Sequence, residues 1–240
     1  MSEQIILGIP GTWKDASEVA QAIVQESQDL FFAGFTLMDA TTQEVSFVEW
    51  HDHDPRLVDV FEKLGQPWIN DYDLSQISRH RSTLWVLSSD VSIRHARQMM
   101  KLGQTLLQAG GLGVKVESSG VAHSAQRWQS LARGADATSP LYCAFVNLLE
   151  GSDYAYSCGM HNFGLPDVSL APFTDKEAEA ALMHQFNQYQ IESLSEFQDG
   201  DLFSLSADAP PFRLHFEACD HFAPPHPLFN PFGRWHLTAQ

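Results

Sequence analysis

The stretch from Glu117 to His123 combines small residues with a carboxylate and an imidazole. We expect a strand to end near Glu117 and a helix to begin at the small residues that follow. Free backbone N–H groups at that helix start, with two serine hydroxyls, would bind a small anion. The structural alternative is that Gly120 makes a turn and Ser124 caps the helix. The candidate binding residues are Glu117, Ser118, Ser119, Gly120 and His123.

A second group of reactive residue types follows a predicted strand. Cys158, His161 and Asp167 are the types that act as thiol nucleophile, general base and orienting carboxylate. Ser119 is an alternative nucleophile and His123 an alternative base. The glycines and the proline between these residues are also typical of a turn-rich structural connection. Convergence of both groups in one concave pocket would favour a hydrolase or transferase, whereas scattered residues would remove the support for an enzyme.

Histidine pairs could also bind a metal ion. His51 and His53 lie two apart at the end of a predicted strand, with Asp52 and Asp54 beside them. A helix whose first turn contains a proline, with Asp54 as its N-cap, explains the carboxylates without a metal. A further donor group of Cys219, His221 and His226 lacks the spacing of a metal site. We therefore predict no metal and no cofactor, and stability that does not respond to a chelator.

The first half of the chain predicts the elements that position these residues. Apolar runs predict strands at 5–9, 31–38, 45–50, 83–87 and 112–116. Capping residues and apolar periodicity predict helices that begin near Asp15, Pro55 and Ser92, and a fourth helix at 122–131. Up to residue 87 the order is βαββαβ, which is ferredoxin-like.

The second half predicts a further set of strands and one helix. Strands are expected at 141–149, 154–156, 202–205, 212–216 and 235–237, with a hairpin turn at 150–153. Thr174 and Glu177 predict a capping box for a helix reaching about residue 189. The small, polar stretch 134–140 predicts a boundary between a ferredoxin-like subdomain (1–134) and a second α+β subdomain (141–240). The fold class is α+β or α/β, with mixed sheets and helices on their faces.

Composition limits the functional classes. The chain carries 14 basic and 30 acidic side chains, a net charge of −16, and 44% of its residues are apolar. The apolar content predicts a folded core, and the charge argues against nucleic acid as a partner. We expect no membrane span, no signal peptide and a cytoplasmic location. An odd number of widely spaced cysteines (Cys143, Cys158, Cys219) favours reduced thiols.

The segments GVKVESSGVAHS (113–124) and GMHNFGLPDV (159–168) resemble an uncharacterised bacterial family of unknown function. The resemblance extends from residue 84 to about residue 171 and implies no activity. The sequence therefore predicts a binding or regulatory module with a small anionic ligand or a protein partner. The aromatic residues between Phe222 and Trp235 predict a homodimer contact, because exposed apolar surface commonly mediates association.

Overall fold

Alternating apolar residues in the first half of the chain build a seven-stranded sheet, sheet A. The computed structural model describes residues 4–151, 153–193, 197–220 and 222–240. Neighbouring strands of sheet A are all antiparallel and lie in the order β2-β3-β4-β5-β1-β6-β7. The strands are β1 (Ile6–Gly11), β2 (Leu30–Phe32), β3 (Thr36–Asp39), β4 (Glu44–Asp52), β5 (Ser82–Leu87), β6 (Gly113–Val116) and β7 (Val121–Ser124).

Helices cover the inner face of sheet A. Side chains such as Leu7 and Leu84 alternate onto this face and join one core with Ile23 of α1 and Met100 of α4. Ser92 caps α4 by accepting a hydrogen bond from the N–H of His95, as the sequence predicts. The helices of this half are α1 (Ala16–Glu26), α2 (Leu57–Leu64), α3 (Asp71–Ile77), α4 (Ile93–Gln108), α5 (Ala125–Ala132) and α6 (Thr138–Phe145).

The strand pairing differs from the one assumed for the βαββαβ order. Residues 31–38 form two strands rather than one, because the chain turns at Gly34, whose φ is 80°. β4 pairs directly with β5, so α2 and α3 do not cross over between parallel strands. The helix that does cross over is α4, which joins β5 to β6 on the two sides of β1. Ferredoxin-like character stays a prediction.

The expected helix start at residues 118–120 is wrong. These residues form the turn of the β6–β7 hairpin, in which Ser119 and Gly120 both donate backbone N–H groups to the Val116 carbonyl. Residues 121–124 form β7, which pairs with β6, and their side chains are all buried. α5 begins only at Ala125, where Ser124 accepts a hydrogen bond from the backbone N–H at the third helical position. The structural alternative, with a turn at Gly120 and a Ser124 cap, is therefore the one observed.

The second half of the chain forms sheet B, with six strands in the order β11-β12-β13-β10-β9-β8. β10 and β13 are parallel, and the other neighbours are antiparallel. α7 packs on this sheet through a separate core that contains Met183 and Phe186. The elements are β8 (Asn147–Glu150), β9 (Ala155–Cys158), the 3-10 helix η1 (Met160–Phe163), β10 (Asp167–Leu170), α7 (Lys176–Ser193), β11 (Leu202–Phe203), β12 (Phe212–Glu217) and β13 (Arg234–Ala239).

Two local predictions in this half are wrong. Residues 141–145 belong to α6 and not to a strand, because a short buried apolar run has no period that separates the two. At the start of α7, the Asp175 carboxylate rather than Thr174 accepts hydrogen bonds from the N–H groups of Glu177 and Ala178. The predicted hairpin joins β8 to β9, although Ser152 of its turn lies outside the described residues.

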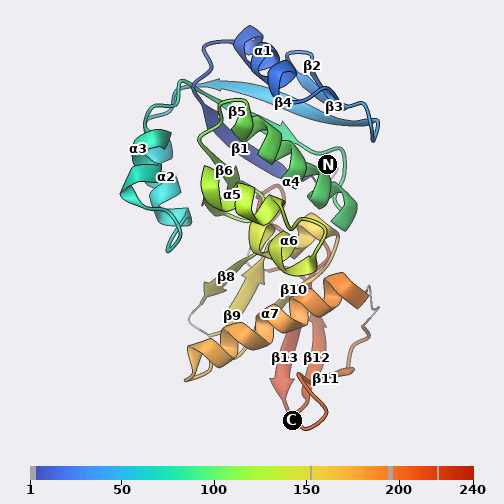
Figure 1. The fold of residues 1–240 in the computed structure, drawn as a ribbon. Helices are drawn as coiled ribbons and strands as arrows, with labels where there is room; N and C mark the ends of the chain where they lie inside the picture. Colours follow the sequence, from blue (N-terminus) through green and yellow to red (C-terminus); the bar gives the residue numbers. More distant parts are fainter. Residues whose placement is uncertain (1–3, 152, 194–196, 221) are drawn as a thin grey trace.

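The fold is α+β, and one core extends across residues 134–140. Leu141 and Phe145 of α6 lie in the same apolar cluster as Leu7 of sheet A. Figure 1 accordingly shows α6 between the two sheets. A division into 1–134 and 141–240 stays a prediction. Among the described helices, none combines the length and apolar character that crossing a bilayer requires.

Candidate functional site

Buried hydrogen bonds connect the β6–β7 turn to η1. Ser118 Oγ donates a hydrogen bond to Asn162 Oδ1 at 2.6 Å, and Asn162 Nδ2 donates to the Gly159 carbonyl at 2.9 Å. Glu117 forms an ion pair with Lys115 at the start of the turn. The turn and η1 therefore meet at a joint between the two sheets, and most of the sequence-derived candidates lie there.

Two side chains in this joint are buried without hydrogen bonds. Within the described parts of the chain, neither Ser119 Oγ nor either ring nitrogen of His161 has a partner. Burial lowers the pKa of His161 to about 4. Gly159, with φ of 124°, permits the close approach, because a Cβ there would lie 2.9 Å from the Ser119 Cβ. Because its pKa lies near 4, His161 is neutral at physiological pH.

Cys158 does not have the environment of an activated nucleophile. Burial raises the pKa of its thiol, and the nearby charges of Asp167 and Cys219 raise it further. The thiolate is the reactive form of cysteine, so Cys158 stays in its unreactive form. No hydrogen bond in the described ranges joins Cys158 or Ser119 to His123 or His161. The spacing that suggested a nucleophile and base does not bring such a pair together.

Asp167 is the centre of a second buried network. Its carboxylate accepts hydrogen bonds from Asn230 Nδ2 at 2.7 Å, Ser157 Oγ at 3.1 Å and the Met160 N–H at 3.2 Å. Burial raises the pKa of Asp167 to about 7, and these hydrogen bonds oppose the shift. The cavity beside Asp167 and Cys158 has a volume of only about 10 Å³, close to the minimum for one water. The network holds β9, η1, β10 and the loop before β13 together and leaves no room for a substrate.

His123 lies between α5 and α6 and has partners on both ring nitrogens. Its Nε2 is 3.0 Å from the Ala144 carbonyl, and its Nδ1 is 3.3 Å from Nε of Arg127. These contacts fit the tautomer in which Nε2 donates and Nδ1 accepts. Burial lowers the pKa of His123 to about 4. The eight candidates thus lie at or near one joint, but they do not surround one open pocket.

His53, one of the two histidines considered and rejected as metal ligands, has other contacts. The His53 ring lies 4.3 Å from the His80 ring, and its Nδ1 is 2.8 Å from the His80 carbonyl. Asp54 accepts hydrogen bonds from the backbone and side chain of Arg56, although it does not cap α2. No group of three or more His, Cys, Asp or Glu side chains gathers around a common point in the described residues.

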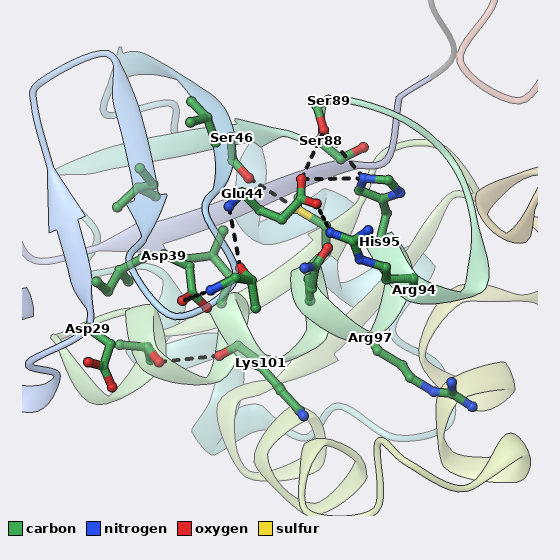
Figure 2. Close-up of a pocket in the computed structure, with 18 of the residues that line it drawn as sticks. Asp29, Asp39, Glu44, Ser46, Ser88, Ser89, Arg94, His95, Arg97 and Lys101 are labelled. Carbon is green, nitrogen blue, oxygen red and sulfur yellow. Dashed lines mark hydrogen bonds and ion pairs between the residues drawn. The ribbon is translucent and has the colours of Figure 1, made fainter.

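An open cleft lies elsewhere, between α4 and the ribbon formed by β2, β3 and β4 (Figure 2). Its volume is about 370 Å³, and the same cleft was not predicted from the sequence. Its apolar lining comes from both sides of the cleft. The residues of that lining are Leu30, Leu37, Met99 and Leu102.

Polar side chains gather at one end of this cleft. The Glu44 carboxylate forms an ion pair with Arg94 and lies 3.5 Å from Nε2 of His95. Ser89 Oγ lies 3.4 Å from the same nitrogen, and Ser92 Oγ lies 2.8 Å from Nδ1. Figure 2 shows Glu44 between the ribbon and these α4 side chains. In a Ser-His-acid triad the serine faces Nε2 and the carboxylate faces Nδ1. Here Glu44 faces Nε2, which it shares with Ser89, and the serine on Nδ1 is Ser92, the N-cap of α4.

One sequence signal could have indicated the cleft. Arg94, Arg97 and Lys101 recur at helical spacing, which places three cations on one face of α4. The apolar periodicity of this helix predicts only its buried face. Comparison with known protein families, curated proteins and solved structures finds no match to this chain.

Proposed function

We propose that the protein is a binding module for a small amphiphilic anion, such as a medium-chain carboxylate, which binds in the cleft between α4 and β2–β4. The observation that supports this proposal is the combination of an apolar lining with the Arg94 guanidinium at one end of the same open cleft. The small anionic ligand expected from the sequence is retained, but its site moves away from residues 117–120. A cytoplasmic location is part of the same proposal.

The size and lining of the cleft suit an apolar chain. Ligand sites commonly have volumes of about 300 to 1,000 Å³ and a mainly apolar lining with a few placed polar groups. The cleft, at about 370 Å³, lies at the small end of this range. Leu37, Met99 and Leu102 would contact the aliphatic part of the ligand.

Arg94 is the charged group of the cleft that would bind an anionic head group. The lining carries three basic side chains, Arg94, Arg97 and Lys101, and three acidic ones, Asp29, Asp39 and Glu44. Arg97 and Lys101 both contact Asp136 outside the lining. Arg94 already binds one carboxylate, that of Glu44. A ligand carboxylate would take the place of Glu44 on Arg94, since guanidinium and carboxylate groups form strong charge-assisted hydrogen bonds. Glu44 therefore competes with the ligand.

The enzymatic alternative has less support. A hydrolase or transferase that uses Cys158 or Ser119 needs a hydrogen-bonded base, and the described residues provide none for either side chain. Asp167 and Cys158 face a cavity of about 10 Å³, which excludes a substrate.

Calorimetric titration with octanoate, octylammonium and octanol tests the proposal. We expect octanoate to bind best, Arg94→Gln to weaken its binding about tenfold, and Glu44→Gln to strengthen it by removing the competing carboxylate. Arg56→Gln is the matched control, because Arg56 lies outside the cleft and bonds to Asp54. Preferred binding of octylammonium would contradict the assignment of an anionic ligand to the cleft. Absence of binding by all three probes would overturn the proposed site.

A further inference from the structure

The outer face of the β2–β4 ribbon carries a row of exposed apolar side chains. Met38 lies directly opposite Phe31 on one neighbouring strand and Val45 on the other. Phe47 follows Val45 on the same face, two residues along β4, and lies opposite Leu87. We call Phe31, Met38, Val45 and Phe47 the ribbon patch.

The ribbon patch is exposed because no described helix covers it. α1 and α4 pack on the inner face, and α2 reaches the outer face only near β6 and β7, where Phe61 joins a small core with Ala122. Phe31 is 51% exposed and Phe47 is 52% exposed, and Phe35 in the adjoining turn is 72% exposed. Contiguous apolar surface of this kind marks contact sites on soluble domains.

The segment first expected to mediate association is less exposed. Trp235 is buried, and Phe222, Phe229 and Phe232 are each partly buried. Phe232 packs against the main core. The ribbon patch is therefore the stronger candidate for a contact surface.

We propose that two copies of this chain associate through their ribbon patches, outer face against outer face about a twofold axis. An aromatic side chain has roughly 200 Å² of surface, so the exposed fractions of the patch and Phe35 together give about 500 Å² of apolar area per copy. A stable interface needs about 800 Å² per partner. The half-buried Ile6, Trp85 and Leu87 extend the same face and supply further area.

The charge distribution gives this proposal a distinctive salt dependence. Each copy carries a net charge of −16, so two copies repel each other at long range. None of the four patch residues is charged, and Glu49 and Lys115 lie beside Trp85 at the edge of the face. Salt therefore screens the repulsion and strengthens the dimer, whereas salt would weaken binding of a cationic partner.

Sedimentation equilibrium of the full chain tests the proposal at about 10 and 100 μM protein and roughly 0.05 and 0.5 M NaCl. We expect a dimer that becomes more stable at the higher salt concentration. Phe47→Asp, and separately Phe31→Lys, should raise its dissociation constant by at least about tenfold. Tyr72→Asp is the matched control, since Tyr72 is 70% exposed on α3 and lies outside the patch.

Circular dichroism of each variant shows that loss of association is not loss of folding. A monomer under all four conditions would overturn the proposal. A dimer that both patch variants leave intact would also overturn it, and weakening by a charge at Phe222 would then assign the contact to 222–235. These outcomes are independent of whether octanoate binds in the cleft.

Discussion

Buried titratable side chains of the joint affect stability with opposite signs. His123 and His161 have pKa values of about 4 in the folded protein, below the ordinary value near 6.5. Between these values the unfolded chain binds protons that the folded chain does not, so each histidine lowers stability as the pH falls. Asp167, with its pKa raised to about 7, holds a proton that the unfolded chain loses near 3.9. Asp167 therefore lowers stability as the pH rises.

We predict that single substitutions separate these effects between about pH 4 and 6.5. Asp167→Asn should make the slope of unfolding free energy against pH more positive by about 1.4 kcal/mol per pH unit, and His161→Gln should make it less positive by a similar amount. Urea unfolding at several pH values measures both slopes. Asp208→Asn, a change at an exposed acid, is the control. An unchanged slope in Asp167→Asn would contradict the assignment.

Adjacent serines in the β6–β7 turn provide a second test at the residue scale. Ser118→Ala removes the hydrogen bond to Asn162 and leaves a buried acceptor unpaired, which costs about 1 to 3 kcal/mol. Ser119→Ala removes a buried hydroxyl that has no described partner, so we expect a much smaller loss or none. Thermal or urea unfolding of the two variants compares them directly. Equal losses would mean that the hydrogen bond to Asn162 contributes nothing specific.

At the scale of elements, glycines determine how closely the turns approach. Gly159→Ala would place a Cβ against the Phe145 carbonyl and the Ser119 side chain, at a φ of 124°. Gly34→Ala meets no atom within 4 Å, although its φ is also positive. We predict a loss of about 1 kcal/mol at Gly34 and more than about 4 kcal/mol at Gly159. Denaturant unfolding measures both losses, and comparable values would show that the joint can relax around a methyl group.

Elements with local signals are the ones that the sequence predicts well. α4 has an N-cap serine, a long apolar period and glycines at its end, and it lies close to where these residues indicate. Residues 121–124 and 141–145 lack such signals, since their buried faces are completed by distant segments. Tertiary packing makes the first a strand and the second a helix. Periodicity over four or five buried residues could not distinguish the two.

At the scale of the whole molecule, the sequence indicated the residues of the closed joint but not the open cleft. The candidates at 117–123 and 158–167 do meet, because β6, β7 and η1 converge at the joint between the sheets. The sequence could not show that they meet in a closed interior. The cleft is assembled from residues 27–46 and 88–105, which are distant in the chain, and it has no local motif. Only the charge pattern of α4 pointed toward it.

The place of β13 in sheet B makes the order of synthesis matter. β13 separates β10 from β12, yet it is the last strand in the sequence, whereas all seven strands of sheet A precede residue 125. At a synthesis rate of about 5 to 20 residues per second, β10 is synthesised on the order of several seconds before β13, its parallel neighbour. During that time its edge can pair with another nascent chain. Mispairing between neighbouring nascent chains on a polysome is therefore a greater risk for sheet B than for sheet A.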